Sequence, residues 1–251
     1  MADYDPLFYE KLFSFIKYLD SFSLRNITEI ITYLLVAVLL YHGYKKYGSK
    51  KIILYFLGGL LLTGLEENFM VIQGYFYLFG GPTYYYDYHS YLFWIGAIPV
   101  VVLCAWFLLT YSSFQIADMI ISNESSKALL KKLLLAGWLG TSIDFVIDPI
   151  IIRRYGWIWL NAKENAVWFL QVPVTNFIGF FLLVASFNYY FVWYWEKYTL
   201  KHDTWSSFKT NGLYFIFVLL PLLFVIGVII ICSILFTPLK GIDFSWWPWL
   251  N

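Results

Sequence analysis

Residues 142–154 read Ser142-Ile-Asp-Phe-Val-Ile-Asp-Pro-Ile-Ile-Ile-Arg-Arg154, and they place two carboxyl groups in a predominantly apolar run that begins near Leu129. Asp144 and Asp148 are about one helical turn apart, so in a helix both side chains project from the same face. An unpaired charge near the centre of a bilayer costs about 3 kcal/mol on insertion scales. We therefore expect these acids to be protonated, paired or turned toward a polar cavity. Pro149 follows the second acid and predicts a kink or a helix end at that depth.

The composition places the chain among integral membrane proteins. Hydrophobic residues make up 61% of its 251 residues, and charged residues make up 13%. Soluble domains carry roughly 25% charged residues, so this chain has about half the usual share. The net charge of +1 argues against a nucleic-acid partner. Both cysteines lie in apolar runs and are expected to be buried free thiols, and the few histidines are not clustered as a di-iron or other metal site would require.

Hydropathy predicts an all-α fold, a polytopic integral membrane bundle that forms a single transmembrane domain over residues 1–251. Apolar positions at three-and-four spacing favour an interfacial helix within residues 1–24. Six spans are expected at residues 27–44, 52–72, 91–116, 129–152, 167–193 and 213–236. Residues 73–90, which are rich in glycine and tyrosine, are expected to form a loop at the aromatic belt of the membrane. No internal repeat is recognised.

The distribution of basic residues predicts the orientation. An even number of spans leaves both termini on one side of the membrane. The first, third and fifth loops carry ten of the 17 Lys and Arg residues. The positive-inside rule therefore predicts that these loops face the cytoplasm and that both termini lie outside. The expected location is the cell membrane.

Acids and amides dominate the polar residues within the predicted spans, and no lysine is expected nearby to neutralise them. The catalytic candidates are Asp144, Asp148, Glu66 and Asn176. Two carboxyl groups in close contact share a proton and titrate as a unit. A neutral carboxylic acid in a dry pocket is a competent general acid. The alternative interpretation of any one of these residues is a hydrogen-bonded contact between packed helices.

Aromatic residues gather at the ends of the same segments. The candidates for substrate contact, most of them aromatic, are Trp157, Trp159, Tyr75, Tyr77, Trp106, Glu67 and Arg153. Aromatic faces attract cations, so a pocket of such rings could stabilise a carbocation and would suit a long apolar or polyene substrate. Ordinary packing at the membrane interface is the alternative for any single ring. Arg153, if it pairs with an acid, would favour a base role for that acid.

Several of these motifs occur together in one known family. Asp144-Phe-Val-Ile-Asp-Pro, Trp157-Ile-Trp and Val172-Pro-Val-Thr-Asn-Phe-Ile-Gly resemble the CruF family of carotenoid biosynthesis proteins. This family includes the bisanhydrobacterioruberin hydratases and related carotenoid hydratases. Upstream, Glu66, Gly74-Tyr-Phe-Tyr, Ile98-Pro and Trp106 are similar to the same family's pattern. The resemblance covers roughly residues 60–185, which we expect to be the catalytic core.

The resemblance implies a hydro-lyase that hydrates a terminal isoprenoid double bond without a cofactor. A protonated Asp144 or Asp148 would donate to the less substituted alkene carbon and leave a tertiary carbocation. Aromatic rings would stabilise that cation. Water, oriented by the other aspartate, by Glu66 or by Asn176, would then add to give a tertiary alcohol. The expected partners are a lipid-soluble carotenoid and membrane lipids, with no metal and no nucleic acid.

Two other functions stay open at this point. A carotenoid cyclase of the lycopene type would begin with the same protonation but quench the cation with an internal double bond. A proton-coupled transporter or lipid-binding membrane protein would use Asp144 and Asp148 as a proton relay. A polar pocket that admits water favours the hydratase, a dry pocket the cyclase, and an aqueous path to both membrane faces the transporter.

Overall fold

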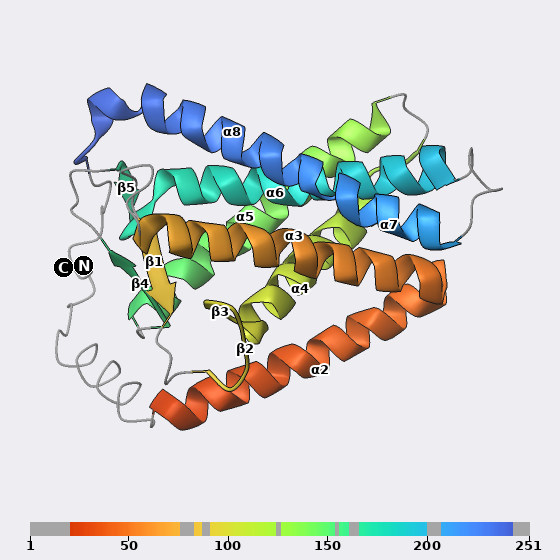
Figure 1. The fold of residues 1–251 in the computed structure, drawn as a ribbon, viewed down its shortest axis with the longest axis horizontal. Helices are drawn as coiled ribbons and strands as arrows, with labels where there is room; N and C mark the ends of the chain where they lie inside the picture. Colours follow the sequence, from red (N-terminus) through yellow and green to blue (C-terminus); the bar gives the residue numbers. More distant parts are fainter. Residues whose placement is uncertain are drawn as a thin grey trace, which may run out of the picture.

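The computed structural model describes residues 21–75, 83–86, 91–123, 127–153, 156–160, 166–199 and 207–242. Long helices lie side by side in a bundle, and the short strands gather toward one end of it (Figure 1). The helices are α2 (Ser21–Tyr47), α3 (Ser49–Tyr75), α4 (Val100–Ile120), α5 (Ala128–Arg153), α6 (Val174–Trp193), α7 (Ser207–Phe217) and α8 (Leu219–Leu235). Within the described ranges, six helical stretches are long and apolar enough to cross a membrane. The predicted all-α membrane bundle is confirmed.

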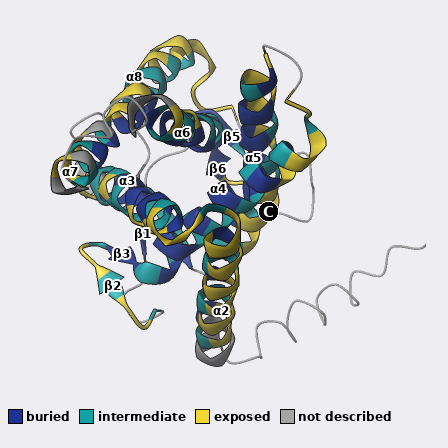
Figure 2. Cartoon of the chain, turned by 90° about the vertical axis from the view of Figure 1, so that its right-hand side faces the viewer, coloured by how far each residue is buried: buried dark blue, intermediate teal, exposed yellow. Residues whose placement is uncertain are grey.

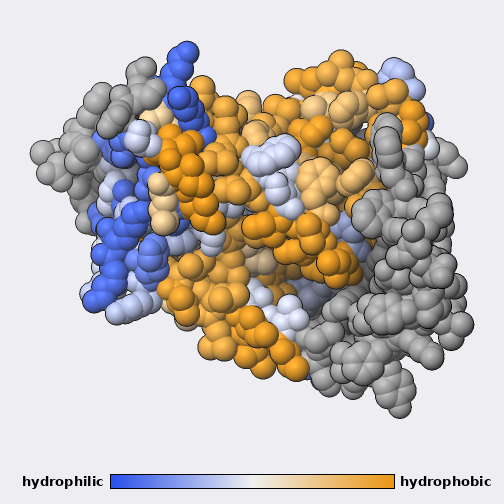
Figure 3. Space-filling model, turned by 180° about the vertical axis from the view of Figure 1, so that it is seen from behind, coloured by the Kyte–Doolittle hydropathy of each residue, from blue (hydrophilic) through white to orange (hydrophobic). Residues whose placement is uncertain are grey.

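The outer surface of the bundle is apolar, as a lipid-facing surface has to be. Many large hydrophobic side chains are exposed along α2 and α8, including Leu34, Val38 and Leu223. They lie on the outward sides of these helices (Figure 2). Seen from behind, an apolar band crosses the molecule and hydrophilic side chains gather at the end opposite the strands (Figure 3). This division fits a protein that spans a bilayer with one strongly polar end.

Two predicted spans begin later than expected, because a hairpin precedes each helix. The hairpin of β2 (Trp94–Ile95) and β3 (Ile98–Pro99) leads into α4. The hairpin of β5 (Trp168–Phe169) and β6 (Val172–Pro173) leads into α6 in the same way. Each proline caps its helix instead of lying inside it. Proline has no N–H to donate, so the start of a helix tolerates it where the interior does not.

Two other prolines behave differently from each other. Pro149 lies inside α5, which continues to Arg153, so a helix end at Pro149 was a wrong expectation. The last predicted span is instead interrupted, because α7 ends at Phe217 and α8 begins at Leu219. Pro221 cannot donate to the carbonyl of Phe217, and its ring crowds that carbonyl. The interruption therefore has a local cause in the sequence.

The expected loop at residues 73–90 contains regular structure. Helix α3 extends to Tyr75, and Thr83–Tyr86 form strand β1. This strand pairs in antiparallel register with β4 (Trp157–Leu160) from the second half of the chain. Most of the predicted interfacial helix at residues 1–24 lies outside the described residues, and the part from Ser21 belongs to α2.

The order helix, strand, hairpin, helix occurs twice in the chain. The first unit is α3, β1, β2–β3 and α4, and the second is α5, β4, β5–β6 and α6. Thr63 and Thr141 each donate to the carbonyl of the glycine one turn earlier, at 2.9 and 2.8 Å. Glu66 and Asp144 each follow that threonine by three residues. Helices α3 and α5, which carry the acids, therefore occupy equivalent positions in a duplicated unit.

The two units meet around a local two-fold relation. In the β1–β4 pair, the first residue of each strand faces the last residue of the other. Trp106 and Phe180 lie at matching distances after the prolines that cap α4 and α6, and their rings stack with centroids 4.1 Å apart. The expectation that the chain has no internal repeat is wrong. The repeat is expressed in hydrogen bonds and register, while few residues are identical between the halves.

Candidate active site

Glu67 is a buried carboxylate near the end of α3, with 6% of its surface exposed. The indole Nε1 of Trp106 on α4 donates to its Oε1 at 2.7 Å. The hydroxyls of Tyr84 and Tyr86 on β1 both donate to its Oε2, the latter at 2.9 Å. The two tyrosines are alternate residues of a strand, so both side chains lie on the same face. Glu67 is held from two elements by three donors.

The two tyrosines that hold Glu67 stay protonated over a wide pH range. Burial raises the pKa of Tyr84 well above the ordinary tyrosine value, and the nearby carboxyl of Glu67 raises it further. The pKa of Tyr86 is raised well above its ordinary value by the same two causes. Both hydroxyls therefore remain available as hydrogen-bond donors to the carboxylate.

Asp144 and Asp148 face each other along one side of α5, as the sequence predicts, and each is 5% exposed. Their carboxyl groups lie within interaction range of each other. Asn176 on α6 binds both, because its Nδ2 donates to Asp148 Oδ2 at 2.9 Å and lies 3.3 Å from Asp144 Oδ2. Two buried carboxyl groups this close avoid mutual repulsion when one of them holds a proton. The pair is therefore built to hold a shared proton.

The two acid pairs form one cluster. Glu67 is close enough to act electrostatically on both aspartates and on Glu66. Glu66 Oε2 is buried and has no hydrogen-bond partner among the described residues. Four carboxylates in an apolar region repel one another unless they share protons. The structure thus brings together all four predicted acids and Asn176.

Trp157 and Trp159 pack beside the two tyrosines that donate to the Glu67 carboxylate. On β4, the ring of Trp157 lies 5.9 Å from that of Tyr86, and the ring of Trp159 lies 4.7 Å from that of Tyr84. The indole Nε1 of Trp159 is buried without a partner among the described residues. These rings therefore flank the tyrosines that hold the acid.

Other predicted site residues fall partly outside what the structure describes. Tyr75 and Arg153 end α3 and α5, but their side chains lie outside the described residues. Tyr77 lies outside them altogether. Within the described ranges, no group of three or more His, Cys, Asp or Glu residues is arranged to hold a metal ion. Cys104 is a buried free thiol, as expected, whereas Cys232 is a free thiol that is only partly buried.

Tyr84 and Tyr86 were not among the residues predicted to form the site. They belong to a run of tyrosines that resembles an ordinary aromatic belt at the membrane interface. Trp106, a predicted substrate contact, is also a hydrogen-bond donor to Glu67, which the sequence did not predict. The available signal was the alternation of the two tyrosines in a short segment of strand-forming residues.

Comparison with known proteins gives one match. A family model described as "Carotenoid biosynthesis protein" matches residues 26–242. No match was found among curated proteins or among solved structures. The matched range contains the four acids, Asn176 and both repeated units, and it extends beyond residues 60–185 at both ends.

Proposed function

The chain belongs to the family of carotenoid biosynthesis proteins, and from this membership and the acid cluster we propose that it hydrates an acyclic carotenoid. It has a role in carotenoid biosynthesis and is built as an integral membrane protein. The proposed reaction adds water across a terminal isoprenoid C=C bond. The observation that carries the proposal is the buried Asp144–Asp148 pair, whose two carboxyl groups are bridged by Asn176.

The aspartate pair supplies the proton in this proposal. One carboxylic acid of the pair donates its proton to the less substituted carbon of the double bond, and the alkene electrons form the new C–H bond. A tertiary carbocation results, and the pair keeps one negative charge. Asn176 holds both side chains in place and stabilises that charge by donating to the oxygens of both. Positioned acids of this kind contribute about 10²- to 10⁴-fold to a rate.

Glu67 and its donors suit a different role. The indole of Trp106 can only donate, so Oε1 of Glu67 is an acceptor. A fixed acceptor with negative charge stabilises a nearby cation, and so do the faces of the surrounding aromatic rings. In the last step a water oxygen bonds to the cation, and the proton that it loses returns to the aspartate pair. The sum is alkene plus water to tertiary alcohol.

The polarity of the cluster favours water addition over cyclisation. Glu66 carries a buried carboxyl oxygen without a partner in the described part of the chain, which a water molecule can satisfy. A small cavity that Thr63 and Thr110 help to line lies on the neighbouring stretch of α3 and α4. A cyclase needs the cation to be shielded from water until an internal double bond attacks. We therefore propose hydration as the reaction, with a carotenoid substrate in keeping with the family and the cell membrane as the location.

Product analysis tests this proposal. The protein is expressed in cells that accumulate lycopene-type or fifty-carbon acyclic carotenoids. The pigments are separated by chromatography, and their masses are determined by mass spectrometry. The proposal expects a mass gain of one or two waters that is absent with Asp144→Asn/Asp148→Asn. A product of unchanged mass and altered absorption would indicate cyclisation instead of hydration. An unchanged pigment profile would contradict both reactions.

A further inference from the structure

A second polar region lies at the end of the bundle opposite the strands. A cavity of about 240 Å³, here named the vestibule, lies between α3, α4, α5 and α6 at that end. Its wall includes Lys51, Gln115, Asp118, Lys132 and Glu196. Ionised groups are costly to remove from water. Acids and lysines on the wall therefore keep the vestibule wet, whichever lipid surrounds the bundle.

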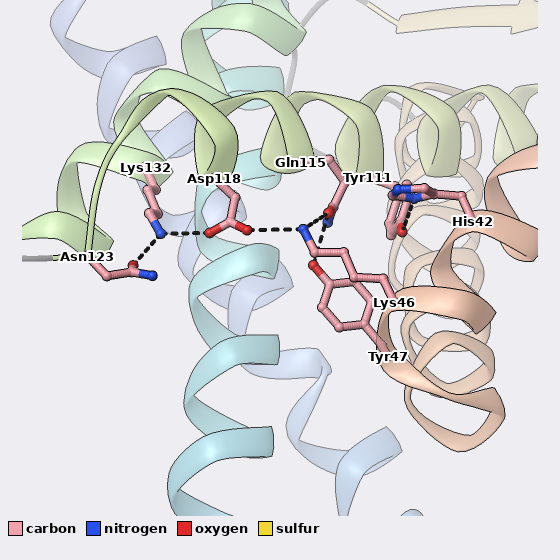
Figure 4. Close-up of polar contacts among 8 residues, drawn as sticks. All are labelled: His42, Lys46, Tyr47, Tyr111, Gln115, Asp118, Asn123 and Lys132. Atoms are coloured by element: carbon pink, nitrogen blue, oxygen red, sulfur yellow. Dashed lines mark hydrogen bonds and ion pairs between the residues drawn. The ribbon is translucent and has the colours of Figure 1, made fainter.

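A chain of ion pairs and hydrogen bonds runs along the wall of the vestibule (Figure 4). Lys46 at the end of α2 lies 3.1 Å from Asp118 Oδ2, and Lys132 on α5 lies 2.6 Å from Asp118 Oδ1. Lys132 is almost fully buried and also donates to Asn123 at 2.5 Å. Lys132 is held by its two acceptors, so this side of the vestibule carries charged groups in fixed positions.

A smaller cavity, here named the inner chamber, lies deeper along the same helices. Its volume of about 10 Å³ has room for about one water molecule. Its wall includes Thr63 and Trp106. Thr63 precedes Glu67 by four residues on α3, which places both on one face, and Trp106 donates directly to Glu67. The inner chamber therefore lies next to the acid cluster.

Tyr55 separates the two cavities, because its side chain lines both. Its hydroxyl donates to Asn188 Oδ1 at 2.8 Å, and Asn188 donates in turn to the carbonyl of Val184 at 2.8 Å. Both side chains are buried in a box of aromatic rings that includes Phe187 and Phe191. A hydroxyl and an amide at this depth offer hydrogen bonds to a water that passes between the cavities.

We propose that water reaches the acid cluster from the end that carries Lys46 and Lys51. It would cross the vestibule, pass the Tyr55–Asn188 pair and occupy the inner chamber beside Thr63. The purpose of this path rests on the proposed function, because each hydrated double bond consumes one water in a site surrounded by apolar helices. The path itself makes a prediction that does not depend on the reaction.

Gly59 offers a way to plug the path without disturbing the fold. It lines the inner chamber, and a Cβ built on it would meet only Phe187, at 3.7 Å, which is ordinary contact. Gly59→Ala therefore fills space that would hold the water, and alanine is the better helix former. Gly64 on the same helix is a matched control, because its Cβ would meet only Leu103 at 3.7 Å and it does not line the chamber.

The path is tested by the access of silver ions to a single thiol. Thr63→Cys is placed in the full-length chain after Cys104→Ala and Cys232→Ser, and silver nitrate is added to one face of membrane vesicles of known orientation. Thiols that have not reacted with silver are then quantified by alkylation in detergent. We expect reaction only from the face that carries Lys46. A Val38→Cys control, exposed to lipid in α2, should remain unreacted from either face.

The glycine variants decide the outcome. Gly59→Ala should abolish the silver reaction at Thr63→Cys, while Gly64→Ala leaves it unchanged. Reaction from the opposite face, reaction from neither face, or reaction that survives Gly59→Ala would overturn the path. If silver reaches the thiol but no hydrated product forms, the proposed function is refuted and the water path is supported. If hydrated product forms but silver does not reach the thiol, the water path is refuted and the proposed function is supported. The two failures are therefore distinguishable.

Discussion

Replacing Asp148 with asparagine removes the shared proton while leaving the geometry of the pair intact. Asparagine has nearly the same size and can still accept from Asn176, whose Nδ2 lies 2.9 Å from the present carboxyl oxygen. Its amide can also donate to the neighbouring carboxyl group of Asp144. We therefore expect Asp148→Asn to insert and fold normally and to lose its proton donor.

The size of the loss follows from what the proton does. A positioned general acid contributes about 10²- to 10⁴-fold to a rate, which is roughly 3–5 kcal/mol of activation free energy. Asp144 and Asp148 hold one proton between them in this account, so Asp144→Asn should cost about as much. The double variant should lose little more than either single variant, because groups that act as a unit are not additive.

The assay is the initial rate of product formation by purified protein in detergent or liposomes, with size-exclusion chromatography as the check on folding. Val146→Leu, on the lipid-facing side of α5 between the two acids, is the matched control and should keep the normal rate. Full activity of a folded Asp148→Asn variant would refute its role as part of the donor. Losses that multiply in the double variant would refute the shared proton.

Three further changes test other parts of the structure. Asn176→Leu removes a donor to both aspartates and should slow turnover about 10- to 100-fold without loss of carotenoid binding, measured by rate and by pigment co-purification. Trp106→Phe keeps a ring against Phe180 but deletes the 2.7 Å bond to Glu67, at a cost of about 1.5–3 kcal/mol in activation free energy. Asp118→Ala leaves the buried Lys132 without its acid and should lower the free energy of unfolding by about 1–3 kcal/mol, measured by thermal melting. An unchanged rate or melting temperature would contradict the corresponding role.

The bundle and the acids were predictable because both follow from the chemistry of the bilayer. A run of about 20 apolar residues has few alternatives to a spanning helix. Asp144 and Asp148 were predictable as a pair for the same reason, since one helical face must carry both. Their contact with Asn176 follows once α5 packs against α6, and the structure shows that packing.

The boundaries next to Pro99 and Pro173 were harder to predict. Hydropathy continues across each hairpin, so the apolar pattern alone cannot separate a strand of two residues from the first turn of a helix. Proline is tolerated at the start of a helix but not in its interior, and this was the physical signal for a later helix start. In the last predicted span, by contrast, Pro221 follows an interruption between α7 and α8 within the span itself.

The pairing of β1 with β4 could not be predicted from either segment alone. It joins residues more than seventy positions apart, and its register depends on the two-fold relation between the repeated units. The roles of Tyr84 and Tyr86 depend on that pairing, since the strand directs both hydroxyls to Glu67. Long-range contacts of this kind leave little trace in local composition.

The most direct test of the central claim is the source of the oxygen in the product. Purified protein is incubated with an acyclic carotenoid in water enriched in heavy oxygen, and the product is analysed by mass spectrometry. The account predicts a tertiary alcohol that carries the heavy oxygen and does not form with Asp144→Asn/Asp148→Asn. A product without the label, or a cyclised isomer of unchanged mass, would contradict it.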